Sequence, residues 1–208
     1  MTIKAILFDM DGVLIDAKDW HYIALNKALK QFGIFISRES HLATFDGLPT
    51  RKKLEILSNT HALPTGLQEF INELKQIYTL EISYQQCKPT FNHRYTLKML
   101  KHYGYKIAVC SNSVRQTIET MMNLSCLHEY LDLIISNQDV SKSKPDPEMY
   151  VKAMQEFDVK PHECLILEDN DHGVQAALSS GGHLLRIGVP SDVTFSRITN
   201  KINEINPH

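Results

Sequence analysis

The chain has 208 residues, of which 43% are hydrophobic and 22% are charged, and its formal net charge is −2. These values are typical of a globular protein and give no basic field that would attract nucleic acid or an anionic membrane. No apolar stretch reaches membrane-spanning length, and the first apolar run is too short for a secretory signal. The four widely spaced cysteines form no CxxC pair. We therefore expect reduced thiols and a cytoplasmic protein without nucleic-acid or membrane partners.

An apolar segment at residues 2–8 predicts a buried strand, and Asp9, Asp11 and Gly12 follow it directly. Two carboxylates this close together are costly unless a cation or a proton transfer uses them. Gly12 permits a sharp turn that could present backbone N–H groups to an anion. The segment could therefore hold a nucleophilic carboxylate, a second carboxylate for proton transfer and a divalent metal.

Residues 16–86 show helical periodicity and no convincing pair of strands. Asp19 is a candidate N-cap for the first helix, which should end near residue 32. Two further helices are expected at residues 51–58 and 67–78. The second would present one apolar face made of Phe70, Ile71, Leu74 and Ile77. An all-helical block inserted directly after the first strand is well placed to act as a lid.

Strands and helices alternate in the rest of the chain. Strands are expected at residues 106–110, 131–135, 164–167 and 183–187, with helices at residues 90–103, 114–124, 147–157 and 171–180. This alternation indicates parallel βαβ units. The predicted fold is α/β, with a Rossmann-like parallel sheet core made of residues 1–15 and 87–208 and an inserted all-helical cap domain at residues 16–86.

Polar residues follow two of the later predicted strands and could bind phosphate. Ser111 and Asn112 offer a hydroxyl and N–H groups at the start of a helix, although the same residue types are common helix caps. Lys144 lies in a loop that prolines fix. It could neutralise a transferring phosphoryl group, or it could be a solvated surface lysine.

Glu168 and Asp169 follow another apolar strand and could supply oxygen ligands to Mg²⁺, or they could belong to a capping cluster in which Asn170 caps the next helix. The carboxyl ends of parallel strands meet at one edge of a sheet. This pair, Asp9 and Asp11 would therefore lie with a hydroxyl and a lysine at that edge. The set suits metal-assisted phosphoryl transfer through an aspartyl phosphate.

The order of these motifs resembles that of the haloacid dehalogenase-like (HAD) superfamily. The most similar subgroup has a helical cap and includes β-phosphoglucomutase and sugar-phosphate phosphatases. The resemblance covers essentially the whole chain. It rests on Phe-Asp-Met-Asp-Gly-Val at residues 8–13, Ser-Asn at 111–112, Lys-Pro-Asp-Pro-Glu at 144–148 and Glu-Asp-Asn at 168–170.

The resemblance implies a role for each of these residues. Asp9 would attack phosphorus, and Asp11 would protonate the leaving oxygen and then deprotonate water. Ser111 and Lys144 would bind phosphoryl oxygens, with Lys144 also paired to Asp9; Lys142 is the competing lysine. The implied Mg²⁺ ligands are Asp9, Asp11 through its carbonyl, Asp169 and Glu168, the last as a ligand or as a support for the others.

Residues 45–54 resemble the substrate-specificity loop of the family's cap. Gly47 could need backbone freedom there, while Arg51 and Lys53 could meet a second anionic group of the substrate or lie on a solvated helix face. Lys53 could also form a Schiff base, as a cap lysine does in related phosphonatases. His21 resembles the cap histidine of the mutases and could equally be a packed or exposed helix residue. The candidate substrate-binding residues are therefore Ser111, Asn112, Gly12, His21, Gly47, Arg51 and Lys53.

Ala17 stands at the hinge position where the mutases tend to carry a hydroxyl. It favours a monomeric Mg²⁺-dependent phosphatase acting on a small phosphorylated metabolite, such as a sugar or polyol phosphate. One alternative is a β-phosphoglucomutase-like mutase. Another is a phospho-acceptor signalling module, although such modules have no inserted helical cap. A silent binding protein is the third, and the complete motif set argues against it.

Overall fold

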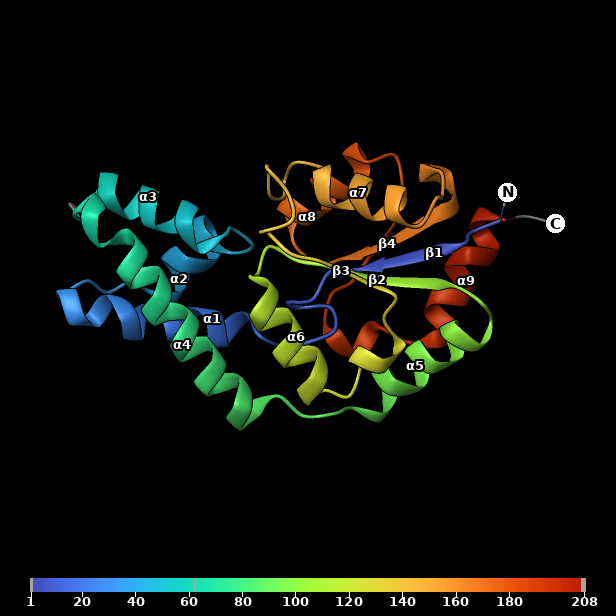
Figure 1. Cartoon of the computed structure of the whole chain (residues 1–208), viewed down its shortest axis with the longest axis horizontal. Helices are drawn as coiled ribbons and strands as arrows, with labels where there is room; N and C mark the ends of the chain where they lie inside the picture. The colour runs from blue at the N-terminus through green and yellow to red at the C-terminus, as the bar shows by residue number, and fades with distance from the viewer. Residues whose placement is uncertain (1, 62, 207–208) are drawn as a thin grey trace.

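The computed structural model of the chain describes residues 2–61 and 63–206. Its core is a five-stranded sheet with the strand order β3-β2-β1-β4-β5, in which every neighbouring pair is parallel (Figure 1). The strands are β1 Ala5–Phe8, β2 Lys106–Cys110, β3 Leu133–Ile135, β4 Cys164–Glu168 and β5 His183–Arg186. Each overlaps a segment that the sequence predicts as a strand, so the Rossmann-like α/β core is confirmed.

Helices cover both faces of the sheet (Figure 1). On one face lie α5 Phe91–His102, α6 Arg115–Leu124 and α9 Phe195–Ile205, and on the other lie α7 Glu148–Glu156 and α8 Asp171–Ser179. Side chains of β1 alternate between the layers: Ile6 and Phe8 pack with the first group, Ala5 and Leu7 with the second. All four are fully buried. The central strand is therefore fixed from both sides, and so is the loop that leaves its carboxyl end.

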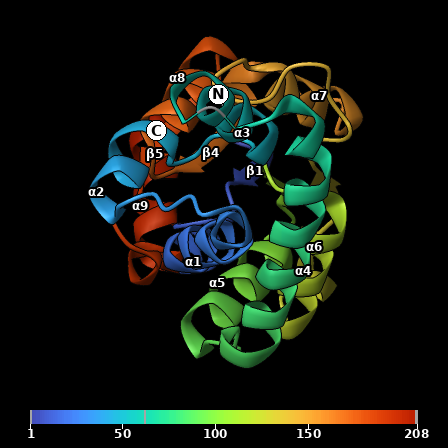
Figure 2. The same cartoon turned by 90° about the vertical axis from the view of Figure 1, so that its left-hand side faces the viewer.

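A second group of helices lies beyond the carboxyl edge of the sheet, at the left of Figure 1 and toward the viewer in Figure 2. Its helices are α1 Lys18–Leu29, α2 Arg38–Ser40, α3 Thr50–Thr60 and α4 Gln68–Gln86, with shorter helical turns at Lys30–Phe32, His41–Phe45 and Thr65–Leu67. The group has an apolar core of its own, which includes Leu25, Leu29, Leu54, Leu57 and Ile71. The inserted helical cap is thus present, while its boundaries at residues 16 and 86 stay a prediction.

The register of the cap helices differs from the sequence prediction. Helix α1 begins at Lys18 with Ala17 at its N-cap, so Asp19 lies in the first turn and is not the cap. In α4, Phe70 and Ile77 are 53% and 52% exposed, so the predicted apolar face is wrong at these positions.

The buried stripe of α4 consists of Ile71, Lys75, Thr79 and Ser83, spaced four residues apart. The hydroxyls of Thr79 and Ser83 donate to backbone carbonyls one turn earlier, so these polar side chains can be buried. A helix with a polar buried face does not show the apolar periodicity on which the prediction rests.

Helix α9 lies in a segment for which the sequence predicts no helix. Thr194 caps this helix by accepting from the N–H of Arg197, and Ile198 and Ile202 are buried one turn apart. None of the helices formed by residues 2–61 and 63–206 is long and apolar enough to cross a membrane.

Candidate active site

The candidate residues come together because parallel strands end at one edge of the sheet. Asp9 and Asp11 follow β1, and Ser111 follows β2. Lys144 lies in the loop between β3 and α7. These four side chains line a cavity of about 940 Å³ whose other wall is formed by cap residues. The volume is in the range of small-molecule sites.

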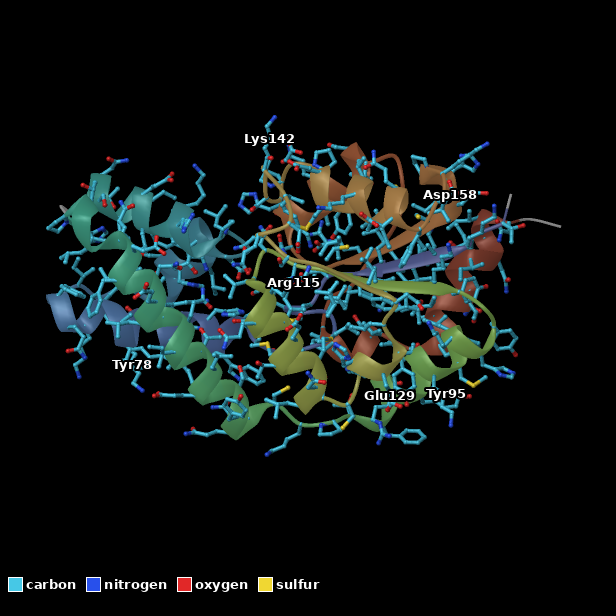
Figure 3. All side chains as sticks on the ribbon, viewed as in Figure 1. Tyr78, Tyr95, Arg115, Glu129, Lys142 and Asp158 are labelled. Carbon is cyan, nitrogen blue, oxygen red and sulfur yellow. The ribbon has the colours of Figure 1, made fainter. Side chains whose placement is uncertain are left out.

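The ammonium group of Lys144 is the cation of the buried centre. Its Nζ donates to Asp9 Oδ1 and Glu168 Oε1, both at 2.6 Å, and to the Cys110 carbonyl oxygen at 2.8 Å. Burial alone would lower the pKa of Lys144, but the two carboxylates raise it above its ordinary value, so the amine stays charged. The side chain of Lys142 is 74% exposed and extends outward from the molecule (Figure 3).

Glu168 is fully buried and every oxygen of its carboxylate is engaged. Oε1 also accepts from the hydroxyl of Tyr150 at 2.6 Å, and Oε2 accepts from the backbone N–H of Asp169 at 3.1 Å. A Cβ at Gly173 would lie 2.0 Å from Oε1, so the glycine makes room for this carboxylate. Tyr150 belongs to the apolar layer of α7 and carries no motif, so no sequence pattern distinguishes it from other core residues.

Three buried carboxylates form a cluster that fits a divalent cation. One oxygen each from Asp9, Glu168 and Asp169 lies within 4.8 Å of the others. Burial raises the pKa of Asp9 well above its ordinary value, and the neighbouring carboxylates add to this against the opposing pull of Lys144. A cation would offset this repulsion, and oxygen ligands suit Mg²⁺. Asp169 is already paired, because Lys18 Nζ lies 2.6 Å from its Oδ2.

Asp11 contacts the cap. His21 Nε2 on α1 lies 3.0 Å from Asp11 Oδ1, and the Ser113 hydroxyl donates to Asp11 Oδ2 at 3.1 Å. On the other side of the imidazole, Lys75 Nζ of α4 lies 3.1 Å from His21 Nδ1. Burial would raise the pKa of Asp11, but His21, Lys75 and Ser113 together lower it below its ordinary value. A core acid is therefore held by side chains of two cap helices.

The cap loop after His41–Phe45 closes onto the core. The Gly47 carbonyl accepts from Asn112 Nδ2 at 2.9 Å, and Asn112 Oδ1 accepts from the Lys144 N–H at 3.0 Å. Gly47 has φ +72°, and a Cβ there would lie 2.8 Å from Asn170 Oδ1, so conformation and space both require glycine. Asn170 caps α8, as the sequence suggests.

Gly12 contributes space at the carboxylate cluster. Its φ is +89°, and a Cβ would lie 2.2 Å from Asp169 Oδ2. Its N–H donates to the Ile15 carbonyl at 2.7 Å. The turn itself therefore uses the N–H of Gly12, and the presentation of backbone N–H groups to an anion by this turn stays a prediction. Ser111 is buried beside the cavity, and its Oγ accepts from the Ser113 N–H at 3.1 Å.

The cap cations fall into two kinds. Arg51 lines the cavity, but its side chain is 72% exposed and lies 3.3 Å from Glu69, so it stays outside the buried centre. Lys53 is 5% exposed and lines the cavity. Lys75, which the sequence analysis missed, is equally buried. The sequence pattern that could have indicated its burial is its position four residues, about one helical turn, after the buried Ile71.

Comparisons with known proteins identify the family to which the chain belongs. The haloacid dehalogenase-like hydrolase family matches residues 6–187. The phosphoglycolate phosphatase of Aquifex aeolicus is 28% identical over 213 residues, covering 99% of this chain and 98% of that protein. The phosphorylated carbohydrates phosphatase of Thermotoga maritima is 29% identical over 182 residues, covering 86% and 82%. The fold of β-phosphoglucomutase from Clostridium difficile matches with a TM-score of 0.86 at 22% identity, over 100% of both chains. This chain belongs to the haloacid dehalogenase-like hydrolases.

Proposed function

We propose that the chain is a Mg²⁺-dependent phosphatase that hydrolyses a small phosphorylated metabolite, such as a sugar or polyol phosphate monoester, through an aspartyl phosphate on Asp9. The observation that carries the proposal is the buried ion pair of Asp9 and Lys144 beside Asp11 in a cap-covered cavity. A carboxylate nucleophile, a fixed cation and a second acid form the set that phosphoryl transfer through a covalent intermediate needs.

In the first half of the reaction, a carboxylate oxygen of Asp9 attacks phosphorus and the bond from phosphorus to the leaving alcohol breaks. Asp11 gives its proton to that alcohol oxygen. In the second half, Asp11 takes a proton from water, the water oxygen attacks phosphorus, and the bond to Asp9 breaks to release phosphate. The lowered pKa of Asp11 suits the second half, and the incoming phosphate charge favours its protonated form in the first.

The residues that would hold Mg²⁺ are Asp9, the Asp11 carbonyl and Asp169, with Glu168 as their support because its oxygens already accept from other groups. Bound there, Mg²⁺ would supply positive charge that offsets the charge of the transferring phosphoryl group. Ser111 and Lys144 would bind the phosphoryl oxygens.

The test is phosphate release by the purified protein with Mg²⁺ from a panel of small phosphomonoesters. Asp9→Asn should abolish turnover, because an amide is neither a nucleophile nor a good metal ligand. Asp158→Asn is the matched control, since Asp158 is exposed and lies at the end of the core away from the cap (Figure 3). Release by Asp9→Asn at the wild-type rate would rule out the assigned nucleophile.

The second candidate is a phosphosugar mutase, which the contact of His21 with Asp11 at 3.0 Å favours because His21 resembles the mutase cap histidine. Ala17 opposes it, since it is fully buried at the hinge and offers no hydroxyl to shield a phosphoenzyme from water. Conversion of β-glucose 1-phosphate to the 6-phosphate faster than phosphate release would select the mutase.

A further inference from the structure

Two buried lysines of the cap line the cavity without a carboxylate partner. Lys53 lies on α3 and Lys75 on α4, and each is 5% exposed. Among residues 2–61 and 63–206, no ion pair joins either lysine to a carboxylate. Lys75 instead contacts the His21 imidazole. The cap thus places two buried amines beside the cavity, and neither forms an ion pair with a carboxylate of the described residues.

This arrangement is costly for the free protein. Burial lowers the pKa of Lys53 to about 8 and that of Lys75 to about 7, and the charge of Lys53 adds to the shift of Lys75. A buried charge is ordinarily paired, because the loss of its hydration is not otherwise offset. Strongly shifted groups that line a cleft are candidates for contacts with a ligand.

Asp46 and Asp11 raise the pKa of Lys53, and Asp11 raises that of Lys75, but burial lowers both by more, so these carboxylates offset the two buried charges only in part. Asp46 lies 3.9 Å from the Lys18 ammonium, and Asp11 is held by His21. Burial and the charge of Lys53 lower the pKa of His41 to about 4, so this imidazole is neutral. The cap side of the cavity also carries Glu55 and Glu69, but these pair with Lys52 and Arg51, whereas Lys53 and Lys75 are buried there and form no such pair among the described residues.

The lysines also lie close to the reaction centre. Lys75 Nζ is 3.1 Å from His21 Nδ1, and His21 Nε2 is 3.0 Å from Asp11 Oδ1. One imidazole ring therefore separates Lys75 from the candidate acid. An anion bound at Lys75 would be only a few bonds away from a phosphoryl group beside Asp11.

We infer that Lys53 and Lys75 bind a second anionic group of the substrate. The preferred substrates are then short phosphomonoesters that carry a carboxylate or a second phosphate a few bonds from the reacting phosphate. This inference rests on the proposed phosphatase function and narrows its substrate class. Lys53 determines specificity through the distal anion alone. Lys75 also contacts His21, so its substitution would disturb the imidazole beside Asp11 as well.

The test compares substrates that differ in the distal group, which is anionic in one member of each pair and neutral in the other. One pair is phosphoglycolate and its amide, and the other is the bisphosphate and the monophosphate of 1,3-propanediol. The wild type should favour the anionic member by about ten-fold or more in kcat/KM, because a charge-assisted hydrogen bond contributes that much. The two pairs distinguish a carboxylate from a second phosphate as the natural group.

Lys53→Met should remove most of this preference, chiefly by raising KM for the anionic member. The matched control is Lys52→Met, since Lys52 is exposed on the same helix and pairs with Glu55. Because methionine replaces an unpaired buried charge with an apolar chain of similar length, Lys53→Met should also raise the thermal midpoint of the free protein. The inference would be overturned if the wild type had the same kcat/KM for both members of each pair. It would also be overturned if folded Lys53→Met kept the wild-type preference for the anionic member.

A binding measurement separates this inference from the proposed function. Calorimetry on Asp9→Asn, which should not turn substrate over, compares phosphoglycolate with its amide, and then repeats the comparison with Lys53→Met added. Tighter binding of phosphoglycolate that depends on Lys53 supports the anion site even if no ester is hydrolysed. Equal binding of the two compounds refutes it even if phosphate release is fast.

Discussion

Lys144→Met should destabilise the protein strongly in the absence of metal. The ammonium of Lys144 lies 2.6 Å from both Asp9 Oδ1 and Glu168 Oε1, and the three side chains are 3%, 6% and 0% exposed. Methionine keeps the length of the chain but removes the charge. Two neighbouring carboxylates then remain buried without their cation.

The expected loss follows from this burial. Removing one partner of a buried ion pair costs about 3–5 kcal/mol, because the remaining charge is left without hydration or a counter-charge. That is a large part of a total unfolding free energy of roughly 5–15 kcal/mol. For a chain of this size it corresponds to a fall in thermal midpoint of about 6–20 °C.

Urea denaturation of the metal-free protein at pH 7, followed by circular dichroism, measures the loss directly. The control is Lys142→Met. The side chain of Lys142 is 74% exposed and lies 3.8 Å from Asp146. Exposed ion pairs of this kind contribute about 0–1 kcal/mol to stability. If Lys144→Met loses less than about 1 kcal/mol, Lys144 is not the counter-ion of the buried carboxylates and the electrostatic account of the centre is wrong.

Three further variants probe the metal site, the cap and the turn. Lys18→Met should tighten Mg²⁺ binding roughly two- to five-fold in titration calorimetry, since Lys18 competes for Asp169 Oδ2; weaker binding would contradict this. Lys53→Met should gain up to roughly 3 kcal/mol over the wild type at pH 7 in urea denaturation. The buried amine binds fewer protons in the folded than in the unfolded chain. The wild type therefore recovers stability as the pH rises from about 8 to 10.5. If Lys53→Met is still more stable than the wild type by the same amount at pH 10.5, Lys53 is not a buried amine with a lowered pKa. Gly12→Ala should lose more than about 1 kcal/mol, because its Cβ would meet Asp169 at φ +89°, whereas Gly66→Ala, in open space, should not; equal effects would argue against a tight turn.

The core could be predicted from the sequence because its signals are local and agree with one another. β1, β2 and β4 are buried on both faces, so each reads as a continuous apolar run. The polar residues that follow these runs then lie at one edge of the sheet. The proximity of Asp9 and Lys144 can therefore be predicted from the strand order alone, without knowledge of side-chain contacts.

The cap could be predicted only as a helical block. Which face of α4 is buried depends on Lys75, Thr79 and Ser83, whose polar side chains give no apolar periodicity. The contact of Lys18 with Asp169 depends on how closely α1 approaches the core, which no local pattern encodes. Tyr150 reaches Glu168 from within an apolar layer, where a tyrosine looks like any other core residue.

The contacts between cap and core connect substrate choice with chemistry. In the closed arrangement described here, the cap supplies His21 to Asp11, Lys18 to Asp169 and the Gly47 carbonyl to Asn112. Cap side chains therefore contribute to the proposed acid site while the cap covers the cavity, as a closed lid would. A substrate without a distal anion would leave the buried cap amines unmatched in that closed state. Such a substrate would thus be disfavoured in the conformation that we propose for phosphoryl transfer, and binding energy far from phosphorus would be expressed in kcat/KM.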